Sequence, residues 1–163
     1  MQRIRDACHV ISKVHAASGN QEDIAMDNKL KELLKKDYVI LDGGMGTMLQ
    51  AAGMKMGETP EMLNITEPEL LISIHEQYLK AGADIIYANT FGGNRYKLEE
   101  CGHSVDELVT AGIKNAKKAC ANVNPRALVA LDVGPIGCMR AKSHSLALIS
   151  FKLFLIIPNL RDL

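Results

Sequence analysis

The sequence predicts an α/β domain built on a parallel sheet, and three observations support this prediction. Runs dominated by apolar residues at 38–41, 84–88 and 127–131 alternate with segments of helical periodicity. The runs are apolar throughout rather than alternating, which is typical of strands buried on both faces of a parallel sheet. Each run ends in polar or glycine-rich residues, and in parallel α/β folds this end of the strands carries the site.

Composition narrows the classes of function. The 163 residues include 19 Lys+Arg and 19 Asp+Glu, so the formal net charge is zero, and aromatic residues make up 4% with no Trp. This balance favours neither a nucleic acid nor an anionic membrane as partner. No apolar stretch approaches the roughly 18 residues of a membrane span. The four cysteines form no C-x-x-C pair, so we expect a reduced, cytoplasmic setting.

The first element after an N-terminal extension (1–29) is an amphipathic helix at 27–36, followed by the strand 38–41. This strand ends at Asp42-Gly43-Gly44, which matches neither the dinucleotide fingerprint nor the Walker A loop. Two interpretations remain open for these glycines. Their backbone lies very close to another group, or they form a plain strand-to-loop turn.

A long connection, 43–65, follows, with a helical turn predicted at 47–52. Its four methionines either line an apolar pocket or belong to a loosely packed loop. Thr66 to Glu69 has the capping-box pattern, with Pro68 in the first turn of the helix that it starts. Gly82 is the expected end of this helix. His75 lies beside the apolar stripe and is predicted to be a packing histidine.

The second strand, 84–88, ends at Asn89-Thr90-Phe91, and a short helix is predicted at 94–100. A second capping box, Ser104 to Glu107, starts the helix that precedes the third strand. That strand, 127–131, ends at Asp132. We expect the three strand ends to converge on one rim, where the Asn89 amide either binds an amino acid or serves local turn chemistry.

The chain changes character in its last part, 140–163, which is predicted to be a divergent apolar tail. Residues 146–157 are almost entirely apolar. They form either a strand in the core or an aggregation-prone foreign segment. The expectation is that open sheet edges favour self-association.

The chain resembles the homocysteine S-methyltransferase family in four segments, which occur in the same order as in the family. These segments are 40–50, 63–70, 74–92 and 130–137. Their hallmarks are Leu-Asp-Gly-Gly-Met-Gly-Thr, Leu-Asn-Ile-Thr, Ala-Gly-Ala-Asp-Ile-Ile with Ala-Asn-Thr-Phe-Gly, and Leu-Asp-Val-Gly-Pro-Ile-Gly. The likeness covers about residues 37–139. Within the family it is greatest to the N-terminal domain of cobalamin-dependent methionine synthases.

The resemblance implies a parallel (β/α)8 TIM barrel, of which this chain has the first three strands. It implies homocysteine as substrate, a methyl donor, and zinc and methylcobalamin as the cofactors of the family. Zinc activates the homocysteine thiol, because a coordinated thiol is deprotonated. The residues that the resemblance places in the homocysteine site are Asp42, Gly43, Gly44, Asn89, Thr90 and Phe91.

The Gly-Gly-Cys-Cys-Gly run that holds the zinc in this family does not occur here. No metal ligand or catalytic residue is therefore assigned. The predicted function is homocysteine binding within a methyltransferase that makes methionine, with this chain alone a truncated fragment of little activity. Two alternatives stay open: the N-terminal half of another small-molecule TIM-barrel enzyme, and a non-catalytic fragment that assembles with another chain.

Overall fold

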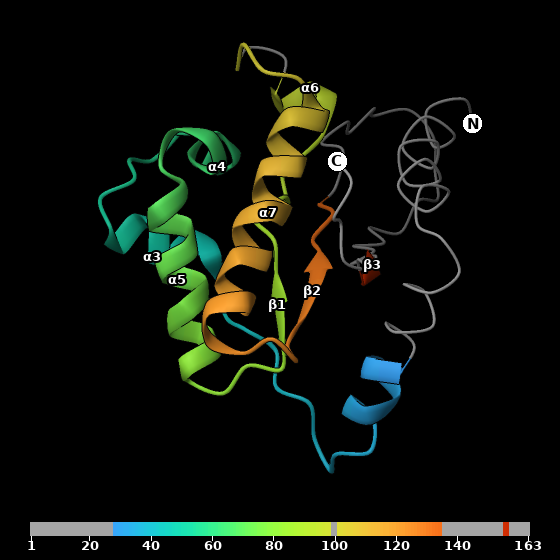
Figure 1. Cartoon of the computed structure of the whole chain (residues 1–163). Helices are drawn as coiled ribbons and strands as arrows, with labels where there is room; N and C mark the ends of the chain where they lie inside the picture. Colours follow the sequence, from blue (N-terminus) through green and yellow to red (C-terminus); the bar gives the residue numbers. More distant parts are fainter. Residues whose placement is uncertain (1–27, 99–100, 135–154, 157–163) are drawn as a thin grey trace, which may run out of the picture. The chain divides into compact units, whose positions relative to one another are not determined.

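The computed structural model describes residues 28–98, 101–134 and 155–156 (Figure 1). The chain divides into two units, Met1–Tyr38 with Ile157–Leu163, and Val39–Ile156. In the first unit, residues 28–33 are helical, which matches part of the predicted helix at 27–36. The extension before residue 28 lies outside the described residues. The labelled helices and strands of Figure 1 all belong to the second unit.

The sheet of the second unit contains a parallel pair at its centre. Strand β1 (Ile85–Tyr87) pairs in parallel with β2 (Leu128–Leu131), with Ile86 opposite Val129. Leu41 forms a parallel bridge to Ile85 on the other side of β1. The three predicted apolar runs are therefore neighbours in one parallel arrangement, and the prediction of a mixed α/β fold with a parallel sheet is confirmed.

The first predicted strand, 38–41, is shorter than expected, since only Leu41 makes a bridge. Ile40 is held mainly by Asp84: its N–H donates to Asp84 Oδ2 at 3.1 Å, and its oxygen accepts from Asp84 N at 2.8 Å. A side-chain acceptor thus replaces one bond of a regular ladder. Ile40 and Leu41 remain 41% and 44% exposed, so this segment lacks the burial on both faces that its apolar composition suggests.

Two helices cover one face of the sheet, α5 (Pro68–Lys80) and α7 (Val105–Val123), and they lie side by side (Figure 1). The predicted capping box of α7 is confirmed, because Ser104 Oγ accepts from Glu107 N at 3.2 Å and Ser104 N donates to Glu107 Oε2 at 2.8 Å. Gly82 follows the C-cap of α5 with φ of 103°, as predicted.

The capping box predicted at Thr66 is wrong. Thr66 is the last residue of α4 (Leu63–Thr66), and its hydroxyl donates to Met62 O at 3.2 Å. Glu67 occupies the N-cap position of α5 with φ −136° and ψ 57°, and makes no side-chain cap. The cause is Pro68, because a proline ring disfavours helical geometry at the residue before it.

The long connection forms three short helices, α3 (Met45–Ala51), the 3₁₀ helix η1 (Pro60–Met62) and α4. Leu49 of α3 joins Leu71 and Ile74 of α5 in a buried cluster against which Met48 and Met54 pack. Met45 packs against the same cluster, so three of the four loop methionines contact the core, whereas Met56 is 94% exposed.

Two further elements complete the second unit. Helix α6 (Arg95–Leu98) corresponds to the short helix predicted at 94–100. Strand β3 (Leu155–Ile156) pairs antiparallel with β2, with Ala130 opposite Ile156. The remainder of the predicted tail, and the turn at 135–137, lie outside the described residues. None of the described helices is long and apolar enough to cross a membrane.

Candidate functional site

A cavity of about 440 Å³ lies beside the residues that follow β1 and β2. One wall comes from the long connection, and the other comes from the strand ends and α6. The first wall is formed by Met45, Gly46, Glu58, Thr59, Pro60 and Glu61, and the second by Asn89, Phe91, Gly92, Lys97 and Asp132. The cavity thus occupies the rim that the sequence predicts for a site.

The lining combines negative charge with a small apolar surface. Glu58, Glu61 and Asp132 contribute carboxylates, whereas Lys97 contributes an ammonium group. Lys97 Nζ lies 5.3 Å from the centre of the Phe91 ring, within the range of a cation–π contact. The ring is 45% exposed and can meet a ligand. This set of groups suits a small ligand that has both a cationic group and an apolar part.

Glu61 is one of several lining residues, with Glu58 and Lys97, that the sequence did not suggest. It is buried, with 4% of its surface exposed, and its Oε1 accepts from the N–H of Gly92 at 2.5 Å. A Cβ atom on residue 92 would lie 2.7 Å from this oxygen, so a larger residue there would displace the Glu61 carboxyl group. No local motif marks Glu61, since its partner is 31 positions away along the chain.

Asn89 and Phe91 both line the cavity, but the amide of Asn89 also holds the two walls together. Its Nδ2 donates to Pro60 O at 2.8 Å and to Asn64 Oδ1 at 3.0 Å. The side chain is 6% exposed. Asn89 therefore fixes η1 against the end of β1, and the expectation of local turn chemistry does not describe these long-range contacts.

Thr90 lies on the rim but does not line the cavity. It is 3% exposed, its Oγ1 donates to Asp132 O at 2.9 Å, and it accepts from Asp132 N at 3.2 Å. The hydroxyl thus joins the end of β1 to the end of β2. Its position explains why a threonine follows the strand without requiring a ligand.

Asp42 also binds to the rim, from the other side of β1. Its Oδ2 accepts from Tyr87 N at 2.9 Å, and its N–H donates to Ile85 O at 3.1 Å. Burial, and then the negative charges of Asp132 and Asp42, raise the pKa of the Tyr87 hydroxyl. The ends of the three apolar runs therefore lie along one rim, as predicted.

Gly43, directly after Asp42, makes room for a tyrosine of α5. A Cβ on residue 43 would lie 2.9 Å from Tyr78 Oη, and this hydroxyl donates to Gly44 O at 3.3 Å. Burial is the main cause that raises the pKa of Tyr78, with the charge of Asp42 second. Of the two interpretations left open, close approach is correct, and the approaching group is Tyr78. Gly43 and Gly44 are not among the residues lining the cavity.

The described residues do not provide a donor set that fits the zinc of this fold family. Of the described cysteines, Cys120 is buried on α7, whereas Cys101 contacts Thr59 Oγ1 at 3.8 Å. Across 28–98, 101–134 and 155–156, no three His, Cys, Asp or Glu side chains converge in a way that could hold a metal ion.

Comparison with known proteins assigns this arrangement to a family. The family model for homocysteine S-methyltransferase matches residues 39–154. The chain belongs to the homocysteine S-methyltransferase family. The matched range contains the whole cavity and every predicted site residue.

Curated relatives of this family member match over part of its length. It is 40% identical over 74 residues to a methionine synthase of Mycobacterium tuberculosis, covering 42% of this chain and 6% of the relative. A selenocysteine Se-methyltransferase of Brassica oleracea var. italica is 33% identical over 95 residues, covering 56% of this chain and 28% of the relative. The chain thus spans a small share of these relatives.

Solved structures of the same family show a similar fold. The metallated form of the homocysteine methyltransferase MmuM from Escherichia coli matches with a TM-score of 0.58 and 29% identity, covering 67% of this chain and 42% of that one. Its oxidized form matches with a TM-score of 0.59 and 30% identity. The chain therefore spans less than half the length of this enzyme.

Proposed function

We propose that this chain is the homocysteine-binding part of a methyltransferase that transfers a methyl group to the homocysteine thiol and so makes methionine. The cavity at the strand ends is the proposed binding site. The observation that supports this best is its lining, which combines the carboxyl groups of Glu58, Glu61 and Asp132 with a half-exposed Phe91 ring in a chain of this family. The proposed architecture is the first three strands of a (β/α)8 barrel.

Each predicted site residue has a role in this proposal. Phe91 and Met45 contact the thiol-bearing side chain of homocysteine, while the nearby carboxylates attract its ammonium group. Asn89 meets the ligand directly. Asp42, Gly43, Gly44 and Thr90 shape the rim through the contacts described above.

The chemistry of methyl transfer requires a thiolate, which in this family zinc provides, and a methyl donor such as methylcobalamin. The described residues offer no fitting set of zinc donors. We therefore infer that this chain by itself binds homocysteine but transfers methyl groups slowly or not at all.

A binding experiment on the full 163-residue chain tests the proposal. Calorimetric titration with L-homocysteine should give saturable binding, and 4-mercaptobutanoate, which lacks the ammonium group, should bind more weakly. Phe91→Ala should weaken homocysteine binding by roughly fivefold, since an exposed aromatic contact contributes about 1 kcal/mol.

The matched control is Tyr38→Ala, which removes a ring that is 72% exposed and is not among the residues lining the cavity. Its homocysteine affinity should equal that of the unmodified chain. A folded chain that shows no saturable binding of homocysteine would contradict the proposed function.

A second candidate function, assembly with another chain, is favoured by the edge formed by residues 39–41. Within the described residues, this segment pairs with β1 on one side and with no strand on the other. Ile40 and Leu41 remain partly exposed there. An unpaired edge with apolar side chains favours addition of a strand from another chain, including self-association. Sedimentation at increasing concentration should show oligomers, which Leu41→Lys should reduce.

A further inference from the structure

Three asparagines are buried where α4, the end of β1 and α7 meet. Asn64, Asn89 and Asn115 are 2%, 6% and 8% exposed. Asn64 Nδ2 donates to Asn89 O at 2.8 Å and to Leu108 O at 3.0 Å. Asn115 Nδ2 donates to Asn64 O at 2.9 Å. We call these three residues the amide cluster.

The contacts of Asn64 fix the direction of its amide. Its Nδ2 faces two backbone carbonyl oxygens, and carbonyl oxygens only accept hydrogen bonds. If the amide were reversed, Oδ1 would face both of these acceptors. Asn64 Oδ1 therefore points toward Asn89, where it accepts from Nδ2 at 3.0 Å.

This arrangement in turn fixes the amide of Asn89. Its Nδ2 lies between two acceptors, Asn64 Oδ1 at 3.0 Å and Pro60 O at 2.8 Å. Both hydrogens of the amide are thus used within the protein. The group that remains is Oδ1, to which no residue in the described part of the chain donates, and Asn89 lines the cavity.

A glycine inside α7 makes this packing feasible. Gly112 lies in the middle of a 19-residue helix, where glycine is an unfavourable residue. A Cβ on residue 112 would lie 2.7 Å from Asn64 Nδ2 and 3.2 Å from Asn89 O. The missing side chain allows the helix backbone to lie directly against the amide cluster.

We propose that Asn64 is a positioning residue, which turns the Asn89 side chain so that its carbonyl oxygen is the group presented to the ligand. An oxygen at this place accepts a hydrogen bond, so it recognises the ammonium group of an amino acid and not its carboxylate. Glu61, a second acceptor in the same cavity, reinforces this preference. The inference rests on the proposed function, because the ligand it concerns is homocysteine.

The rival explanation is that Asn64 only stabilises the fold. Asn115 separates the two, because it belongs to the same cluster but donates to the backbone oxygen of Asn64, whereas the Asn89 amide donates to Pro60 O and Asn64 Oδ1. Asn64→Ala and Asn115→Ala both remove buried hydrogen bonds. Only the first removes the acceptor that holds the Asn89 amide.

The first measurement compares two ligands on the full chain, L-homocysteine and 4-mercaptobutanoate. The unmodified chain should prefer homocysteine by at least tenfold. Asn64→Ala should reduce this ratio to threefold or less, whereas Asn115→Ala should leave it unchanged. Equal weakening of both ligands by Asn64→Ala would overturn the proposal.

Gly112→Ala is a second variant, which keeps every polar group and displaces Asn64 through the added methyl group. It should lower the ligand ratio in the same direction as Asn64→Ala. If it folds and keeps the ratio of the unmodified chain, the positioning role is wrong.

The second measurement needs no ligand and no variant. In nuclear magnetic resonance spectra of the unmodified chain, the side-chain NH₂ hydrogens of Asn89 should exchange with water at least tenfold more slowly than those of the exposed Asn122. Fast exchange at Asn89 would overturn the proposal even if homocysteine binds. If homocysteine does not bind but exchange is slow, the proposed function is wrong and the fixed amide is confirmed.

Discussion

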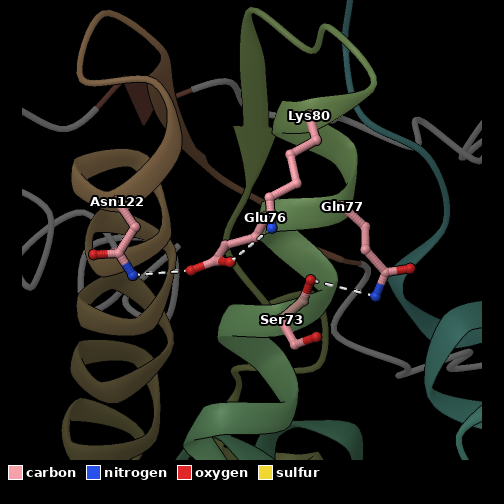
Figure 2. Close-up of polar contacts among 5 residues, drawn as sticks. All are labelled: Ser73, Glu76, Gln77, Lys80 and Asn122. Carbon is pink, nitrogen blue, oxygen red and sulfur yellow. Dashed lines mark hydrogen bonds and ion pairs between the residues drawn. The ribbon is translucent and has the colours of Figure 1, made fainter.

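Helix α7 contains two asparagines, one exposed and one buried, whose side chains donate hydrogen bonds of the same length. Comparing them separates the effect of burial from the effect of hydrogen-bond geometry. Near its C-terminal end, the exposed Asn122 donates to Glu76 Oε1 at 2.9 Å, and Lys80 donates to Glu76 Oε2 at 3.1 Å (Figure 2). Two turns earlier, the buried Asn115 donates to Asn64 O, also at 2.9 Å. If the hydrogen bond is lost, water can replace the missing partner at Asn122 but not at Asn115. The two hydrogen bonds are therefore expected to contribute unequally to stability although their lengths are equal.

Figure 2 shows the polar contacts around Glu76, which lie on the surfaces of α5 and α7. Gln77 Nε2 donates to Ser73 O at 3.3 Å within α5, and Asn122 is the residue drawn from α7. The amide cluster instead joins three elements that are far apart in sequence. Burial is therefore expected to concentrate stability in the amide cluster, next to the proposed site.

His75 provides the test with the largest expected effect. It is fully buried on α5, no residue in the described part of the chain is a hydrogen-bond partner of its ring nitrogens, and burial lowers its pKa from 6.5 to about 4. Between these values the unfolded chain binds a proton that the folded chain does not, so stability falls as pH falls from 6.5 to about 4. The loss should reach about 3 kcal/mol in urea unfolding experiments.

His75→Leu should remove this dependence, whereas the same change at the exposed His103 should not. Hydrogen bonds lower the pKa values of Glu76 and Glu107 from 4.5, so their stabilising effect is lost only at more acidic pH. If His75→Leu keeps the slope between pH 6.5 and 4.5, burial of this imidazole does not govern acid stability.

The two asparagines of α7 give the most direct test of the comparison. Asn115→Ala should lower the free energy of unfolding by about 2 kcal/mol, because the buried oxygen of Asn64 loses its donor. Asn122→Ala makes the same chemical change at an exposed position of the same helix. It should leave the unfolding midpoint within the scatter of replicates. Equal losses for the two variants would contradict the role assigned to burial.

Capping should give an intermediate effect. Ser104→Ala should destabilise the chain by about 1 kcal/mol, since it removes the side-chain acceptor for Glu107 N at the start of α7. Thr66→Ala is the matched change at the other position with a capping pattern, where the hydroxyl only donates back to Met62 O. Thermal unfolding should show a clear shift for Ser104→Ala and little or none for Thr66→Ala. The reverse order would mean that Thr66 caps α5 in solution.

These two positions also show how far sequence patterns reach. The pattern at Ser104 predicts the observed cap, while the same pattern at Thr66 fails because Pro68 keeps Glu67 out of helical geometry. The restriction on the residue before proline can be read from the sequence alone. The exposure of Ile40 and Leu41 was not predictable, since it depends on what pairs with this edge of the sheet.

The site was predictable where residues follow the strands directly. Asn89 and Phe91 line the cavity as the strand ends suggest. Glu61 was missed because it reaches the cavity through the fold of the long connection, which brings η1 to Gly92. The sequence alone does not decide whether another group lies close to Gly43. Only the packing of α5 identifies Tyr78 as that group.

The smallest effect is expected for the ion pair in Figure 2. Lys80 Nζ lies 3.1 Å from Glu76 Oε2, and the side chains are 63% and 22% exposed. Exposed pairs with i, i+4 spacing are screened by water and salt. Lys80→Gln should therefore leave the unfolding midpoint within the scatter of replicates at low salt and identical to the unmodified chain in 1 M NaCl. A loss as large as that of Asn115→Ala, persisting in salt, would show that burial does not separate the two regions.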